Sequence, residues 1–185
     1  DPKNKIILGT VQFGLDYGIN NKMGKPNYPA VKEILQHAYS ENIRTLDTAE
    51  AYGNSQEIIG QFHQECSEIN SETKFKVLTA LKEKSQSALT TLKVPILDCI
   101  SLHNFSELQS NPALIKFYES LKNENLTQQI GVSVYSPEEA IEALQFDAVH
   151  VIQIPFNLHD NENRWAGFFN KKNSLNRKIE VHSRS

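Results

Sequence analysis

Short runs of β-forming residues recur along the chain at nearly regular intervals, and segments with helical periodicity separate them. Seven such runs occur, at residues 5–10, 44–49, 75–81, 98–103, 129–135, 149–155 and 178–183. Several are continuously apolar rather than alternating, as in 149–154, which is typical of strands buried on both faces of a parallel sheet. Strand, helix, strand, repeated along a chain, predicts a parallel sheet with right-handed crossovers.

The intervening segments carry apolar stripes with a period of three to four residues, which predicts amphipathic helices. The stripes are Val31, Ile34, Leu35 and Ala38; Ile58, Ile59 and Phe62; Leu114, Phe117, Tyr118 and Leu121; and Ala140, Ile141 and Leu144. A capping box starts at Ser136, with Pro137 at the first helical position. Asn54 is a weaker start signal, Asn111 precedes a helix-opening proline, and residues 85–92 are predicted to be helical as well.

The mean spacing of the strands, from Leu8 to Val181, is about 29 residues, which matches a (β/α)8 barrel of roughly 250 residues in all. A doubly wound open sheet is the alternative, but no Gly-x-Gly-x-x-Gly follows a predicted strand. We therefore expect residues 1–185 to form one incomplete barrel domain that lacks the eighth strand–helix unit. Either the chain is a fragment or the barrel is open, in which case self-association or a partner would cover its strand edges.

Composition excludes several classes of protein. The net charge is −3 and 39% of the residues are hydrophobic, which suits a globular core rather than disorder. No apolar run approaches the ~18 residues of a membrane span, and residues 1–5 lack the apolar core of a signal peptide. The only two cysteines, Cys66 and Cys99, form no Cys-x-x-Cys motif, which argues against a disulfide scaffold or a cysteine zinc cluster and favours the cytoplasm.

Charge is unevenly distributed along the chain. Residues 164–185 hold six Lys/Arg and one Glu, a local charge of +5, which leaves −8 for residues 1–163 of a chain whose total is −3. This basic stretch is either a solvated helix face or a local attraction for a phosphate-bearing ligand. The acidic remainder argues against nucleic acid as the main partner.

In a parallel barrel, function is found at the carboxyl ends of the strands. There the sequence places Asp47 with Tyr52 after the second strand, Lys82 near the end of the third and His103 at the end of the fourth. A tyrosine can protonate a developing alkoxide if an ammonium lowers its pKa, and a histidine can orient a carbonyl. These residue types suit carbonyl reduction by hydride. A metal-dependent hydrolase would need more inward His and carboxylates, and His182 alone makes no zinc site.

Several strings resemble the aldo-keto reductase family, in the same order and over essentially the whole chain. They are LGTVQFG at 8–14, LDTAEAYG at 46–53, SLHN at 101–104, IGVSVY at 130–135 and VIQIPFN at 151–157. The first string is most similar to a bacterial branch of the family. The resemblance implies a (β/α)8 barrel that reduces small aldehydes and ketones with NADPH and without metal.

Carried over by position, the resemblance implies a role for each matching residue. Asp47 matches the carboxylate that pairs with a catalytic lysine, Tyr52 the general acid and His103 the substrate-orienting histidine. Gly9 and Thr10 match the loop beside the nicotinamide ribose, and Ser133 and Gln153 match the residues that bind the nicotinamide carboxamide. Arg184 and Ser185 begin the segment that follows the pyrophosphate.

Two positions depart from the family's pattern, and the chain stops early. The family's Thr-Lys on the third strand is Thr79-Ala80 here, so Lys82 is the candidate replacement for the catalytic lysine. Val134 stands where an asparagine commonly follows Ser133. The residues that grip the adenosine 2′-phosphate would lie beyond Ser185, so NADPH is expected to be held weakly. The sequence thus predicts a carbonyl reductase, with a catalytically silent binding or regulatory protein as the alternative.

Overall fold

A computed structural model describes residues 5–69, 72–81, 87–156 and 162–184 of the chain. The chain divides into two compact units, residues 1–98 and 99–185, with the division falling inside one strand, β4 (Leu97–Leu102). Each unit is described separately. The prediction of one domain over 1–185 remains a prediction.

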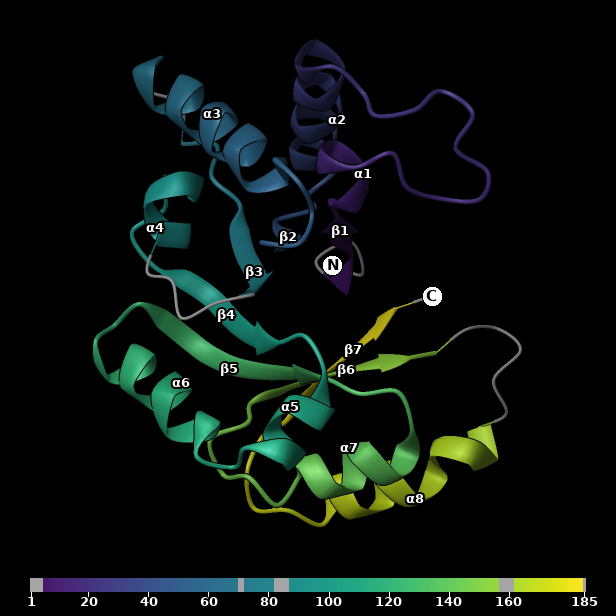
Figure 1. Cartoon of the computed structure of the whole chain (residues 1–185). Helices are drawn as coiled ribbons and strands as arrows, with labels where there is room; N and C mark the ends of the chain where they lie inside the picture. Colours follow the sequence, from purple (N-terminus) through teal and green to yellow (C-terminus); the bar gives the residue numbers. More distant parts are fainter. Residues whose placement is uncertain (1–4, 70–71, 82–86, 157–161, 185) are drawn as a thin grey trace. The chain divides into compact units, whose positions relative to one another are not determined.

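The first unit contains three parallel strands in chain order: β1 (Ile7–Gly9), β2 (Thr45–Ala49) and β3 (Lys76–Ala80). Its helices are α1 (Val11–Gly14), α2 (Tyr28–Ser40), α3 (Ser55–Glu68) and α4 (Ser87–Leu92). Gly9 pairs with Asp47, and Ala49 pairs with Ala80, so the carboxyl ends of these strands lie side by side (Figure 1). Helices α3 and α4 approach each other so closely that a Cβ added at Gly60 would lie 1.8 Å from the Thr91 carbonyl oxygen.

The second unit repeats the pattern with β5 (Thr127–Ser133), β6 (Val151–Pro155) and β7 (Glu180–Arg184), again parallel and in chain order. Its helices are α5 (Phe105–Ser110), α6 (Leu114–Asn123), α7 (Pro137–Ala143) and α8 (Glu162–Asn173). Helix α7 packs on α8, whose Trp165 and Phe168 are fully buried. These two side chains are therefore core residues.

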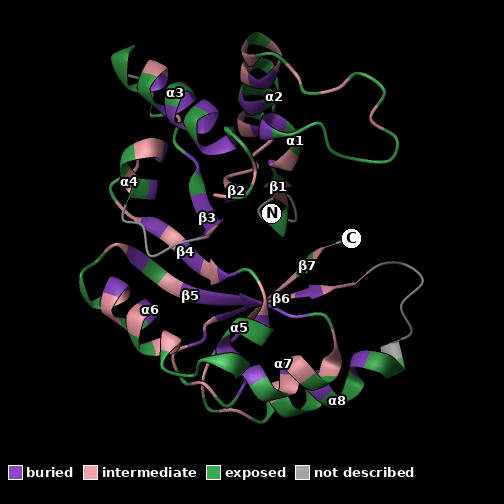
Figure 2. Cartoon of the chain, in the orientation of Figure 1, coloured by how far each residue is buried: buried purple, intermediate pink, exposed green. Residues whose placement is uncertain are grey.

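All seven predicted strands and all four predicted amphipathic helices are present, with ends shifted by a few residues. Burial follows the predicted stripes (Figure 2). Ile34 is an exception, because it lies on the outer side of α2 with 42% of its surface exposed while Val31 and Leu35 are fully buried. The predicted helix over 85–92 is seen as α4, and residues 85 and 86 lie outside the described residues.

The helix starts differ in detail from the sequence signals. Ser136 does cap α7, accepting a hydrogen bond from the Glu139 amide, but the Glu139 carboxylate accepts from Tyr135 N rather than closing the box on Ser136. Asn54 precedes α3 without capping it, since its side chain accepts a hydrogen bond from the Lys25 ammonium instead. A distant partner therefore displaces the local interaction that sequence predicts.

Candidate active site

The carboxyl ends of β1 and β2 are joined by a buried network of hydroxyl groups. Thr10 donates two hydrogen bonds to the Asp47 carbonyl oxygen, from its amide at 3.0 Å and from Oγ1 at 2.9 Å. The Ser55 hydroxyl, at the start of α3, lies 2.9 Å from Thr10 Oγ1 and 3.2 Å from Thr48 Oγ1. These three hydroxyl-bearing residues are almost completely buried. Because unpaired buried hydroxyls are costly, the network fixes Asp47 relative to the first loop.

Tyr52 lies in a tight turn between β2 and α3, and two glycines determine the position of that turn. Gly53 has a φ of +57°, which is strained for other residues. A Cβ on Gly14 would lie 1.6 Å from the Tyr52 carbonyl oxygen, and one on Gly53 would lie 2.4 Å from the Gly14 carbonyl oxygen. The backbone of α1 thus packs directly on the backbone that carries Tyr52. The side chain of Tyr52 is half-buried.

The third strand brings Ala80, not a lysine, beside the end of β2. Ala80 pairs with Ala49 in the sheet, and its carbonyl oxygen accepts a hydrogen bond from Glu50 N at 3.0 Å. The neighbouring Thr79 is fully buried and accepts a hydrogen bond from Gln56 at 2.8 Å. Lys82, the predicted replacement, lies outside the described residues. The assignment of a catalytic lysine therefore stays a prediction.

In the second unit, the sheet register aligns three polar side chains in one row across β5, β6 and β7. Ser133 pairs with Gln153, and Gln153 pairs with His182. The Ser133 hydroxyl donates to Gln153 Oε1 at 3.1 Å, which leaves the Gln153 amide N–H groups to donate elsewhere. A carboxamide ligand needs both a donor and an acceptor, and this pair offers both, so the residues present fit a nicotinamide carboxamide.

His182 is the member of this row that was not selected from the sequence. Burial lowers the pKa of His182, and the carboxylate of Glu180, 3.7 Å away, partly counteracts that shift. The imidazole is therefore neutral near pH 7. Because no motif surrounds His182, only the register of β6 and β7 could have indicated its position in this row.

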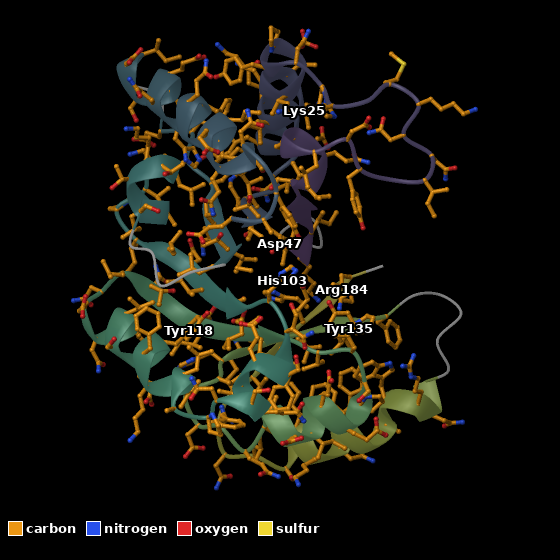
Figure 3. All side chains as sticks on the ribbon, viewed as in Figure 1. Lys25, Asp47, His103, Tyr118, Tyr135 and Arg184 are labelled. Carbon is orange, nitrogen blue, oxygen red and sulfur yellow. The ribbon has the colours of Figure 1, made fainter. Side chains whose placement is uncertain are left out.

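Arg184 and Tyr135 form a stacked pair in the second unit (Figure 3). The guanidinium carbon lies 4.6 Å from the Tyr135 ring centroid, and Nη2 donates to the Val134 carbonyl oxygen at 3.4 Å. Cation–π stacking keeps the guanidinium in place while leaving several N–H donors for an anion. Ser185, predicted beside it, lies outside the described residues.

His103 directly follows β4, and its side chain is exposed. The next residue, Asn104, caps α5 by accepting a hydrogen bond from Ser106 N at 2.9 Å, which fixes the backbone around His103. Gly9, the predicted ribose neighbour, has open space above it, because a Cβ there would meet no atom within 4 Å. That space leaves room for a ligand to approach the backbone.

Two groups of predicted residues are thus brought together, each within one unit. The first comprises Gly9, Thr10, Asp47 and the turn of Tyr52, and the second comprises Ser133, Gln153 and Arg184. Across the described ranges, no group of three or more His, Cys, Asp or Glu side chains is arranged to hold a metal ion. Within the same ranges, no helix is both long and apolar enough to span a membrane.

The fold is shared with solved structures of aldo-keto reductases. A protein of Pseudomonas aeruginosa described as an aldo-keto reductase is 22% identical, with a TM-score of 0.73 over 95% of this chain and 71% of its own. The holo form of an aldo-keto reductase from Bacillus halodurans is 15% identical, with a TM-score of 0.72 over 97% of this chain and 61% of its own. An aldo-keto reductase of the silkworm Bombyx mori is 19% identical, with a TM-score of 0.73 over 98% and 59%. At these identities the likeness establishes the fold, and it confirms the predicted (β/α)8-barrel type with seven of its strands present.

No sequence among the curated proteins matches this chain significantly. The family model described as the Aldo/keto reductase family matches residues 5–174, which is most of the chain and includes each of the strand ends discussed above except that of β7. We conclude that this chain belongs to the aldo-keto reductase family, a family of oxidoreductases that use nicotinamide cofactors on small carbonyl compounds.

Proposed function

We propose that this protein reduces a small aldehyde or ketone, with Tyr52 as the general acid. The observation that carries the proposal is the close backbone contact of Gly14 with the turn of Tyr52 and Gly53, which holds the backbone of Tyr52 in one position. Preorganised placement of a proton donor is what acid catalysis requires, and it is worth ~10²–10⁴ in rate. His103 orients the carbonyl oxygen, and Asp47 holds the ammonium that lowers the pKa of the phenol.

The cofactor is proposed to be NADPH, which supplies the hydride when bound. Ser133 and Gln153 would hold its carboxamide, and Gly9 and Thr10 would border its ribose. Arg184, with Ser185 after it, would meet the pyrophosphate. The stacked guanidinium of Arg184 and the basic stretch 164–185 support an anionic ligand.

The remaining proposals concern the cellular compartment and the partners of the protein. Cys66 and Cys99 are both buried and neither forms a disulfide, which supports a reducing compartment such as the cytoplasm. Self-association, or a partner on exposed strand edges, remains a further proposal from the sequence.

One observation favours a second candidate, a family member that binds a ligand without turnover. Ala80 takes the place of the lysine that the family's motif implies, and an alanine lowers no neighbouring pKa. If Lys82 does not supply the ammonium, Tyr52 would be a poor acid near neutral pH. Quenching of NADPH fluorescence without consumption of NADPH would support this candidate.

The first test removes the phenolic proton. We expect Tyr52→Phe to lower kcat/KM for a generic aldehyde by at least 100-fold, followed as loss of NADPH absorbance, with little change in NADPH affinity. Tyr39→Phe is the matched control, because the Tyr39 ring packs on Phe75 and its hydroxyl makes only a 3.5 Å contact with the Glu72 carbonyl oxygen. Equal turnover by the parent and Tyr52→Phe would refute the proposal.

The second test concerns the ammonium. If Lys82 serves Tyr52, Lys82→Ala should lower kcat by ~10²–10⁴ and shift the alkaline limit of the residual pH–rate profile upward. If it does not, Ala80→Lys should raise kcat by ~10²–10⁴ by restoring the missing general-acid partner. Absence of turnover by both the parent and Ala80→Lys would favour the silent binding protein.

A further inference from the structure

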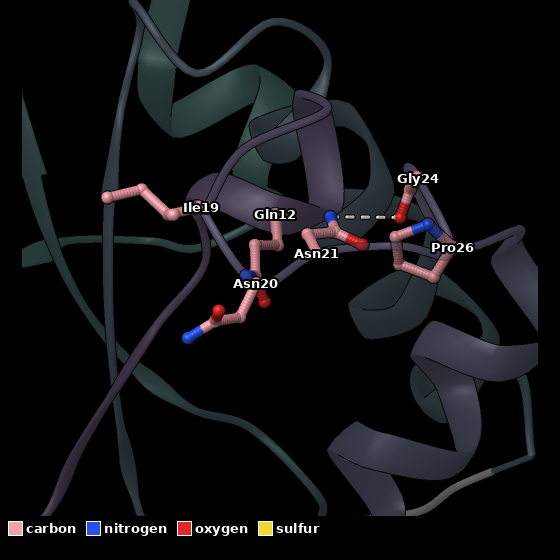
Figure 4. Close-up of a pocket in the computed structure, with 7 residues that line it drawn as sticks. Gln12, Ile19, Asn20, Asn21, Gly24 and Pro26 are labelled. Atoms are coloured by element: carbon pink, nitrogen blue, oxygen red, sulfur yellow. Dashed lines mark hydrogen bonds between the residues drawn. The ribbon is translucent and has the colours of Figure 1, made fainter.

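Besides the cavity in the loop between α1 and α2 (Figure 4), the second unit has a cavity of its own. It measures about 470 Å³ and lies between the end of α6 and the start of β6. A cavity of this size admits a small organic molecule. Its lining combines the ionisable side chains of Glu119, Lys122, Asp147 and His150 with the apolar ones of Ile130 and Ala148.

This cavity is separate from the row of side chains that includes Gln153. His150 directly precedes β6 and already belongs to the sheet, because its amide donates to the Ile130 carbonyl oxygen at 2.8 Å. Its own carbonyl oxygen accepts from Glu180 N at 2.9 Å. Since side chains alternate along a strand, His150 and Gln153 point to opposite faces of the sheet. A ligand in this cavity would therefore occupy a different site from the proposed cofactor carboxamide.

A lysine and a histidine are in direct contact at this cavity. Lys122 Nζ lies 2.7 Å from His150 Nε2, and both side chains are half-buried. Ile130 N lies at the longer distance of 3.4 Å from Nδ1 of the same ring. A neutral imidazole has one acceptor nitrogen, and the shorter distance identifies it as Nε2. Nδ1 then carries the proton, and the imidazole donates a hydrogen bond to the Ala148 carbonyl oxygen.

The surroundings keep the imidazole of His150 neutral. Burial and the nearby cations of Lys122 and Arg177 lower the pKa of His150, and the hydrogen bond to Ala148 partly counteracts them. The ring is therefore able to accept a proton at neutral pH. An amine beside a base that a third group orients is the arrangement of an activated nucleophile. Lys122, His150 and the Ala148 carbonyl oxygen have this arrangement.

The charges around the pair favour an uncharged electrophile. Glu119 and Asp147 contribute carboxylates to the lining, and Arg177 contacts the Asp147 carboxylate at 3.7 Å. An anionic reagent such as an acyl phosphate would meet both carboxylates, whereas an uncharged aldehyde meets them without Coulomb repulsion. Ile130 and Ala148 supply apolar surface for the carbon chain of an aldehyde.

We propose that Lys122 is a covalent site for small uncharged aldehydes, where it forms an imine with His150 as the proton carrier. The ammonium passes a proton to His150 Nε2, and the amine adds to the aldehyde carbon while the carbonyl π electrons move to oxygen. The imidazole passes this proton and a second one from the nitrogen to that oxygen, which leaves as water. A protonated C=N bond remains, so the net charge is unchanged and nothing is oxidised or reduced.

The test uses the whole protein without cofactor, propanal as the aldehyde, and cyanoborohydride to convert imines into stable amines. Mass spectrometry of peptides measures the rate of labelling at each lysine. We expect roughly tenfold faster labelling of Lys122 than of Lys116, an exposed lysine of the same helix outside the cavity lining. Equal labelling of the two lysines in the parent protein would overturn the proposal, whatever the behaviour of any variant.

His150→Gln isolates the proton transfer, because the glutamine carbonyl oxygen can still accept a hydrogen bond from Lys122 but takes up no proton at neutral pH. This variant should label Lys122 within about twofold of Lys116. His37→Gln is the matched control, since His37 is exposed on α2, and it should keep the parent's excess at Lys122. An excess that survives His150→Gln would overturn the role of the imidazole.

Acetyl phosphate distinguishes the two classes of reagent. It should acetylate Lys122 no faster than Lys116, and preferential acetylation of Lys122 would overturn the assignment to uncharged aldehydes. This inference goes beyond the proposed reduction and does not depend on it. Because labelling is measured without NADPH, a protein that reduces no aldehyde still gives a result at Lys122, and the two proposals fail separately.

Discussion

At the scale of single residues, Gly14 constrains the turn of Tyr52 by direct contact between the two backbones. A Cβ at this position would overlap the Tyr52 carbonyl oxygen and approach Ser55 N to 2.7 Å. Neither neighbour is a flexible side-chain end, so the turn or α1 must move. Gly14 is the last residue of the string LGTVQFG in the sequence. Only the folded structure shows that it packs against the backbone of the Tyr52 turn.

We expect Gly14→Ala to destabilise the protein by about 1–3 kcal/mol, as overpacking does. The activity should fall further, by about 100-fold in kcat/KM, because a displaced proton donor loses its alignment. Urea unfolding followed by circular dichroism, together with NADPH consumption, measures both effects.

Gly167→Ala is the matched control for that substitution. It lies within helix α8, and a Cβ there would meet only Ile141 Cδ1 at 3.9 Å, an ordinary contact. It should stabilise the protein by about 0.5–1 kcal/mol through the helix propensity of alanine. A Gly14→Ala protein with the parent's unfolding midpoint and activity would show that the turn tolerates the shift.

At the scale of secondary-structure elements, Arg177 joins the start of β7 to the segment before β6. Its guanidinium donates to the carbonyl oxygens of Leu144, Phe146, Asp147 and Val149. The ion pair with the Asp147 carboxylate contributes little, because that side chain is 99% exposed. The carbonyl contacts therefore carry the interaction and set the approach of β6 to β7.

Arg177→Ala should lower the free energy of unfolding by about 2–3 kcal/mol, since it removes the guanidinium donor from several part-buried carbonyls. It should also raise the KM for NADPH, because the row of Ser133, Gln153 and His182 depends on the β6–β7 register. Chemical unfolding and steady-state kinetics measure the two effects.

Arg177→Lys should recover only part of the stability, because an ammonium cannot form the planar fork. Lys178→Ala is the control, since that side chain is 86% exposed and its ion pair with Glu180 should contribute nothing measurable. If Arg177→Ala unfolded at the same urea concentration as Lys178→Ala, the hydrogen bonds of Arg177 would make no measurable contribution to stability.

At the scale of the whole molecule, three histidines make stability depend on pH. Burial lowers the pKa of His63, His150 and His182 below their ordinary value of about 6.5. His63 is fully buried, with Nδ1 2.9 Å from the Leu92 carbonyl oxygen and Nε2 accepting from Phe75 N at 3.3 Å. The neutral ring satisfies both contacts, and protonation of Nε2 would break the second.

The folded state binds fewer protons than the unfolded state between the lowered pKa values and about 6.5. The histidine contribution is therefore complete above about pH 6.5 and is lost as the pH falls through the folded pKa values. We expect the urea midpoint to decrease between pH 7.5 and pH 5, and less steeply in His63→Gln. The raised pKa of Asp98 acts in the opposite direction at more acid pH. A midpoint that is constant over this range would contradict the prediction.

Much of the fold could be predicted because its signals are local. Strand runs and helical stripes depend on residues within a few positions of one another, so seven strands and four helices follow from the sequence. The places where prediction fails are those where a distant group competes, as Lys25 does for Asn54. Ile34 fits the apolar stripe of α2, yet it lies 42% exposed because burial depends on what packs against the helix.

The sequence by itself determined the alternation of strands and helices, the family, and the residue types at the strand ends. Each of these depends only on residues that lie close together along the chain. Only the tertiary structure decided that His182 joins the row of Ser133 and Gln153 and that Gly14 supports the turn of Tyr52. These contacts link residues about 30–50 positions apart. Strand register and backbone packing create such features, and no local pattern encodes either one.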